Sequence, residues 1–141
     1  MLKILLLLIF IMLELCSIEL VVIGDKDFSE NNLTIQQIRA FFLDKKHFIK
    51  EEKILVMNHK ANHPLRQCFE KEILKKTKRS LERYWQKAYY LGKRPPKIIS
   101  STNMLFLYLD TVHPAIGYSD LNDTVDREVT ILYQATCKND S

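Results

Sequence analysis

The sequence predicts one α/β domain in which a mainly parallel sheet is flanked by helices. Its 141 residues are a one-domain length. With 47% hydrophobic residues, three glycines and four prolines, the composition excludes collagen-like, low-complexity and wholly disordered chains. After residue 17, short apolar strands alternate with helical segments. That alternation is typical of an α/β sandwich around a parallel sheet.

The N-terminus has the pattern of a signal peptide. Lysine at position 3 precedes an unbroken apolar run over residues 4–13, and the small residues Cys16 and Ser17 follow it. A membrane-spanning helix needs about 20 apolar residues, so this run is too short. We expect residues 1–17 to be cleaved and residues 18–141 to be a single domain, exported to the periplasm and not membrane-spanning. The alternative is a buried N-terminal helix.

The first half of the exported chain shows two strands and two helices. The apolar run over residues 18–24 predicts a buried strand. Thr34 and Gln37 have the spacing of a capping box, which predicts a helix over residues 35–43. Residues 53–57 predict a second strand. A second helix is predicted to start at proline 64, a residue suited to the first helical turn, with an apolar stripe at Leu65, Phe69, Ile73 and Leu74.

The second half continues the alternation. Ser80 is interpreted as the cap of a third helix, which Gly92 and the two following prolines end. The inward side of this helix is predicted to comprise Leu81, Tyr84, Trp85, Ala88 and Leu91. The remaining elements are expected to be a strand at 98–99, a helix from Ser101 or Thr102 to about 112, and strands at 115–118 and 129–133.

Two cysteines, Cys68 and Cys137, remain after the expected cleavage. In an oxidising compartment they could form a disulfide. The sequence does not show whether their Cα atoms lie close enough, so the paired and the free states both stay open. No Cys-x-x-Cys motif is present, which leaves redox catalysis without support.

Catalytic and metal-binding motifs are not apparent. The chain has no Gly-rich phosphate loop and no nucleophile beside a base, so we expect no enzymatic activity and no cofactor. His59 and His63 are four residues apart, a spacing that could serve a metal on one helix face. The proline after His63 instead puts His63 at a helix entrance and His59 in a loop. We therefore expect two exposed loop histidines and no metal.

Charge is distributed unevenly around a net charge of +4. Residues 71–97 carry ten basic and two acidic side chains, whereas residues 98–141 carry two basic and six acidic ones. Aromatic residues within the basic segment would suit nucleic acid, yet Tyr84 and Trp85 fall at core spacing. We expect no nucleic-acid partner. The basic face is better suited to a small anion or an acidic partner.

The helix start at residues 62–66 is a candidate anion site. A helix N-terminus offers backbone N–H groups and the positive end of the helix dipole. Arg66, in the first turn, could add a bidentate guanidinium. The alternative is an ordinary capped helix in which Arg66 pairs with a surface carboxylate.

Four pieces of the chain carry a resemblance through their order and spacing: residues 20–23 with 33–46, 54–58 with 63–69, 84–85 with 92–96, and 114–118. His63-Pro64-Leu65-Arg66 stands where the family typically has Gly-Ser-Pro-Leu-Arg, and residues 114–118 are close to Pro-Gly-Ala-Ile-Gly-Tyr. On these pieces the chain resembles the small phosphate ABC transporter substrate-binding protein-like family. Its members are exported proteins related to one lobe of the type 2 periplasmic binding-protein fold.

The resemblance implies a binding-protein lobe that recognises phosphate or a similar oxyanion. The anion would be held by Asn62, His63 and Arg66, with Ser101 and Thr102 added at another helix start. Asn62 and His63 replace the family's Gly-Ser, so the serine hydroxyl donor is lost. A single lobe also provides only half of a cleft. A second function therefore stays open: a module that has lost its ligand and docks on a membrane transporter or sensor through basic residues 75–94.

Overall fold

The central sheet has five strands in the order β5-β4-β6-β1-β7. The computed structural model describes residues 1–14 and 17–138. The strands are β1 (Ile18–Asp25), β4 (Leu55–Asn58), β5 (Lys97–Ile98), β6 (Ala115–Asp120) and β7 (Val129–Cys137). β4 pairs in parallel with β5 and β6, whereas β1 is antiparallel to both β6 and β7. Four strands thus share one direction and β1 alone is reversed, which confirms the predicted mainly parallel sheet.

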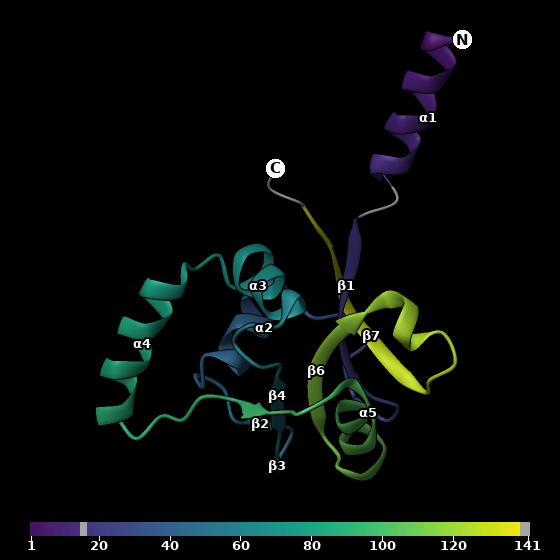
Figure 1. The fold of residues 1–141 in the computed structure, drawn as a ribbon. Helices are drawn as coiled ribbons and strands as arrows, with labels where there is room; N and C mark the ends of the chain where they lie inside the picture. Colours follow the sequence, from purple (N-terminus) through teal and green to yellow (C-terminus); the bar gives the residue numbers. More distant parts are fainter. Residues whose placement is uncertain (15–16, 139–141) are drawn as a thin grey trace.

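Helices flank the sheet on both faces (Figure 1). They are α1 (Leu2–Glu14), α2 (Ile35–Phe42), α3 (Pro64–Phe69), α4 (Lys78–Tyr90) and α5 (Thr102–Thr111). A π-helical turn, η1 (Glu70–Leu74), continues α3, and a 3₁₀ turn, η2 (Leu121–Thr124), follows β6. The predicted arrangement of helices around the sheet is confirmed.

The two faces of the sheet carry separate hydrophobic clusters, because side chains alternate along each strand. On β1, Leu20 and Val22 pack with α2, α3 and η1, whereas Val21 and Ile23 pack with α5. The packing of α5 against the sheet also depends on Gly117 in β6. A Cβ atom at Gly117 would lie 2.6 Å from Leu105 Cδ1 on α5. Glycine at this position therefore allows α5 to approach the sheet closely.

The N-terminal helix α1 stands apart from the rest of the molecule in Figure 1. Both hydrophobic clusters consist of residues from position 18 onward. No helix within the described ranges is long and apolar enough to cross a membrane. Cys16, at the expected cleavage region, lies outside the described residues, as do residues 139–141 of the expected domain.

Three details of the sequence prediction are wrong. The strand expected at 53–57 is split: Glu52–Lys53 forms β3, which pairs with β2 (Phe48–Ile49) in a separate hairpin, and β4 begins at Leu55. Helix α4 begins earlier than predicted, because Thr77 is its cap and accepts a hydrogen bond from the Ser80 N–H. Leu91 is 76% exposed rather than inward, because it lies at the C-cap where the chain leaves the helix.

Candidate functional site

The parallel pairing of β4 with β5 brings two helix starts to one edge of the sheet. Asn58 is paired with Ile98, and the Ile99 N–H donates to the Asn58 carbonyl at 2.9 Å. The chain then leads from β4 to the start of α3 at His63, and from β5 to the start of α5 at Ser101. The carboxyl edge of parallel strands is the usual ligand-binding edge of α/β sheets. The sequence-proposed residues at the two helix starts thus follow adjacent strands at this edge.

At the start of α3, the backbone donors are already bonded within the chain. The His63 Nδ1 accepts the Leu65 N–H at 3.1 Å, which makes His63 the N-cap. The His63 N–H donates to the Lys60 carbonyl, and the Arg66 N–H donates to the His63 carbonyl. Pro64 has no N–H. The His63 imidazole therefore occupies the position at Leu65 N–H that an oxyanion would take.

Two hydrogen bonds hold the guanidinium of Arg66 in place. Its Nε donates to Glu70 Oε1 at 2.8 Å, and its Nη1 donates to the His59 carbonyl at 3.0 Å. Both side chains of the Arg66–Glu70 ion pair are about one-fifth exposed, at 21% and 17%. A guanidinium has five N–H donors, so these two bonds leave others for a ligand. Glu70 nevertheless places a negative charge beside any anion that Arg66 would bind.

The other proposed residues are more open. Asn62 is exposed in the loop before α3. Ser101 is the exposed N-cap of α5, and its Oγ accepts the Met104 N–H at 3.2 Å. A serine hydroxyl that accepts one bond still has its O–H to donate. Thr102 is half-buried as the first residue of α5.

His59 is buried, contrary to the prediction of two exposed loop histidines. Its Nε2 donates to the Tyr118 carbonyl at 2.8 Å, and its ring stacks on the His63 ring with centroids 4.6 Å apart. The Tyr118 hydroxyl in turn donates to Asn58 Oδ1. One signal for this burial is visible in the sequence: His59 directly follows the mostly apolar strand β4, so it lies at a buried strand end.

Burial lowers the pKa of the His59 imidazole below its ordinary value, and the charges of His63 and Arg66 lower this pKa further. The hydrogen bond to the Tyr118 carbonyl acts in the opposite direction. His59 therefore stays neutral in the folded chain at pH values where an unfolded histidine, with a pKa of about 6.5, takes up a proton.

We expect stability to fall as the pH drops below about 6.5, because the unfolded chain then binds a proton that folded His59 does not. One such group contributes at most about 1.4 kcal/mol per pH unit. His59→Gln keeps an N–H donor for the Tyr118 carbonyl but cannot titrate, so its stability should depend less on pH. Urea unfolding of both proteins at pH 7.5 and pH 5.0 measures the difference. Equal pH dependence would show that His59 is not responsible.

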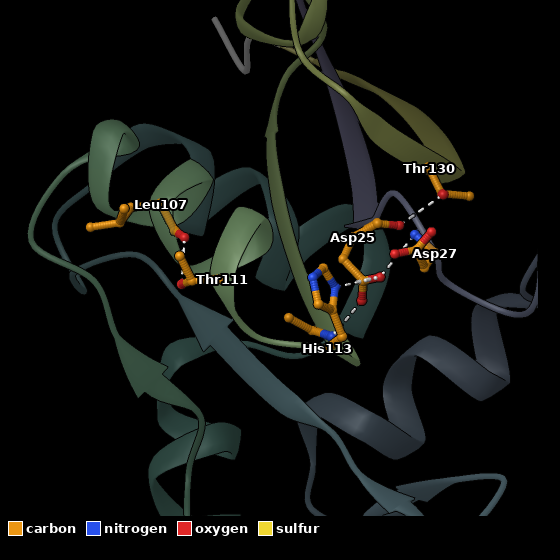
Figure 2. Close-up of polar contacts among 7 residues, drawn as sticks. Asp25, Asp27, Leu107, Thr111, His113 and Thr130 are labelled. Carbon is orange, nitrogen blue, oxygen red and sulfur yellow. Dashed lines mark hydrogen bonds and ion pairs between the residues drawn. The ribbon is translucent and has the colours of Figure 1, made fainter.

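A second polar cluster joins the end of β1 to the start of β6 (Figure 2). Donor atoms of Asp25, Asp27 and His113 all lie within 4.8 Å of one another, so these residues could hold a metal ion. Asp25 is buried, and protein groups already engage both of its carboxylate oxygens. Oδ1 accepts the Asp27 N–H at 3.0 Å and lies 3.0 Å from His113 Nδ1, while Oδ2 accepts the Ala115 N–H at 2.8 Å. These bonds give the cluster a structural role.

Comparison with known proteins gives a fold and no sequence family. No protein-family model matches the chain, and no curated protein matches it. Several solved structures resemble it, and two of them are described here. An ABC-type phosphate transport receptor from Vibrio cholerae superimposes with a TM-score of 0.64 at 18% identity over 82% of this chain and 46% of the receptor. A protein described as a phosphate ABC transporter substrate-binding protein, from Clostridium perfringens and solved with bound phosphate, gives 0.65 at 20% identity over 82% and 44%.

The chain has the fold of a single periplasmic binding-protein lobe. The resemblance proposed from the sequence is thus confirmed at the level of the fold. This lobe matches less than half the length of either solved protein. In this chain, His63 is the N-cap of α3 and Arg66 forms an ion pair with Glu70.

Proposed function

We propose that the chain is a single-lobe solute-binding module that takes phosphate or a similar oxyanion at the edge formed after β4 and β5. The observation that carries the proposal is the parallel pairing of these strands, which brings the starts of α3 and α5 to the same edge, with Arg66 in the first turn of α3. The two similar structures add support, because one is described as a phosphate transport receptor and the other as a phosphate ABC transporter substrate-binding protein with bound phosphate. The proposal assigns the chain no reaction.

In this proposal residues 1–17 direct export and are removed, and residues 18–141 work in the periplasm with a membrane transporter or sensor. The anion would contact Asn62, Arg66 and the Ser101 hydroxyl, with Thr102 at the same helix start. The His63 ring would have to turn away from the Leu65 N–H.

Phosphate is expected to stabilise the chain selectively, and Arg66→Ala should abolish that stabilisation. A ligand at 100 times its dissociation constant adds about 2.7 kcal/mol, a shift of several degrees. The measurement is a thermal-shift titration of residues 18–141 with phosphate and sulfate, with chloride as the ionic-strength control. Arg79→Ala is the matched control, because it removes the same charge from an exposed site on α4.

Glu70→Gln sharpens this test. It removes a negative charge beside Arg66 while keeping a hydrogen-bond acceptor, so phosphate should bind more tightly. If Glu70→Gln leaves phosphate binding unchanged, or if Arg66→Ala retains the full shift, the anion does not bind at Arg66.

The second candidate function is an interaction or sensor-partner module that has lost ligand binding. Two observations favour it: His63 caps the α3 start, and Glu70 neutralises Arg66. Its docking surface would be the basic segment 75–94. In this case no anion gives a selective shift, and reversing the charges of Lys75, Lys76, Lys78 and Arg79 abolishes capture of the transporter or sensor.

A further inference from the structure

The outer face of α4 is a continuous basic stripe. Arg79, Arg83 and Lys87 recur every four residues, and all three are exposed. At 100° per residue they lie, together with Tyr90, within an arc of about 80° on the helix surface. The buried residues Leu81 and Ala88 fall on the opposite side, against the rest of the domain. The stripe therefore faces solvent over the length of the helix.

The end of α4 adds an exposed apolar tip to this stripe. Tyr89, Tyr90 and Leu91 are consecutive and are 62%, 87% and 76% exposed. The Arg94 guanidinium lies over the Tyr89 ring, 4.7 Å from its centroid. Three large exposed hydrophobic residues in a row are uncommon on the surface of a soluble domain and indicate a binding surface. We call Arg79, Arg83, Lys87, Tyr89, Tyr90, Leu91 and Arg94 the α4 ridge.

The three cations of the ridge that lie on α4 have no carboxylate paired with them in the described ranges. Among the residues that the structure describes, Arg79, Arg83 and Lys87 form no ion pair. The segment 71–97 carries ten basic against two acidic side chains, and residues 98–141 carry two against six. Figure 1 shows α4 at the outer edge of the molecule, away from the β6–β7 end. The domain is thus polarised, with its basic end at α4.

We propose that the α4 ridge docks on the surface of a membrane that contains anionic phospholipids. Arginine and lysine side chains reach phosphate headgroups, and each contributes to attraction by a negatively charged leaflet. Tyrosine and leucine at the helix end suit the interfacial region, where an apolar body and a polar tip are both satisfied. The ridge combines cations with an apolar tip, and the surface of an anionic membrane satisfies both together. The proposal goes beyond the oxyanion site and does not depend on it.

The experiment is vesicle flotation with residues 18–141, so that the exposed leucines of α1 cannot contribute. This part retains every residue of both hydrophobic clusters. Vesicles of phosphatidylcholine alone are compared with vesicles that contain phosphatidylglycerol as well, in low and in high salt. We expect binding to the anionic vesicles only, and weaker binding in high salt because salt screens exposed charges.

Two ridge variants and one control locate the contact. Arg83→Glu with Lys87→Glu should lower the partition coefficient by about thirtyfold or more, since two cations near the leaflet are lost and reversed. Tyr90→Ser with Leu91→Ser should lower it by about tenfold through loss of apolar contact. Lys26→Glu with Lys50→Glu makes the same change in net charge at exposed positions near the Asp25–His113 cluster, away from the α4 ridge, and should keep most of the binding. Circular dichroism melts confirm that each variant is folded.

Several outcomes would overturn the proposal. These are equal binding to neutral and anionic vesicles, no binding to either, an equal loss in the Lys26/Lys50 control, or unchanged binding of the Tyr90/Leu91 variant. Binding to polyglutamate without binding to anionic vesicles would also overturn it, and would assign the ridge to an acidic protein instead.

Discussion

Replacing both Cys68 and Cys137 by alanine should lower the free energy of unfolding by about 4 kcal/mol. The two residues are joined by a disulfide, with their Cα atoms 5.6 Å apart and a sequence separation of 69. Cross-linking a loop of this length removes conformational entropy from the unfolded chain, and the chain-entropy relation gives this magnitude. The bond joins α3 to the last residue of β7, so its loss also frees the edge of the sheet to separate from the helix.

Urea unfolding and thermal melts of residues 18–141, both followed by circular dichroism, measure the effect. The melting temperature should fall by about 10–15 °C for a domain of this size. Reductant added to the unmutated chain should reproduce most of the loss, and the alanine variant should not respond to reductant. A loss below about 1 kcal/mol would show that the unfolded chain stays compact without the bond.

The disulfide bears on the proposed location as well as on stability. Sequence reasoning left the paired and free states open, because the separation of two Cα atoms depends on tertiary structure. Structural disulfides persist in oxidising compartments and are rare in the cytosol. The bond therefore supports the proposal of export, and the measured dependence on reductant would show whether the domain relies on that environment.

The order of the elements was predictable because local patterns determine it. The capping box at Thr34 is present, with both reciprocal bonds formed. Strand direction was not predictable for β1, since a strand buried on both faces has the same apolar pattern in either direction. The β2–β3 hairpin has only two residues in each strand, which is too few to show the alternation of apolar and polar residues that is typical of a strand.

The candidate site was predictable in its placement and not in its contacts. Pro64 marked the start of α3, and serine and threonine marked the start of α5. The one-turn spacing of Arg66 and Glu70 makes an ion pair between them possible. It does not show that Arg66 pairs with Glu70 rather than with another carboxylate. The cap formed by His63 depends on a side-chain rotamer. Neither feature can be derived from residue type alone.

Asp25→Ala is expected to lower the free energy of unfolding by about 3 kcal/mol. Asp25 was missed in the sequence because its partners come from a distant segment, yet its side chain is only 1% exposed and joins two strand ends. The variant leaves the buried Ala115 N–H without its acceptor and removes the contact with His113 Nδ1 (Figure 2). A buried donor left without an acceptor is among the most damaging changes to a fold.

Two further substitutions separate the charge of Asp25 from its shape. Asp25→Asn keeps the size of the side chain, but its NH₂ group cannot accept, so either the Asp27 N–H or the Ala115 N–H must face another donor. We expect this variant to lose about 2 kcal/mol or more. Asp27→Ala, at an exposed position, should lose less than about 1 kcal/mol, because the Asp27 N–H still donates to Asp25. If Asp25→Ala and Asp27→Ala unfolded at the same urea concentration, pairing between β1 and β6 alone would hold the start of β6 in place.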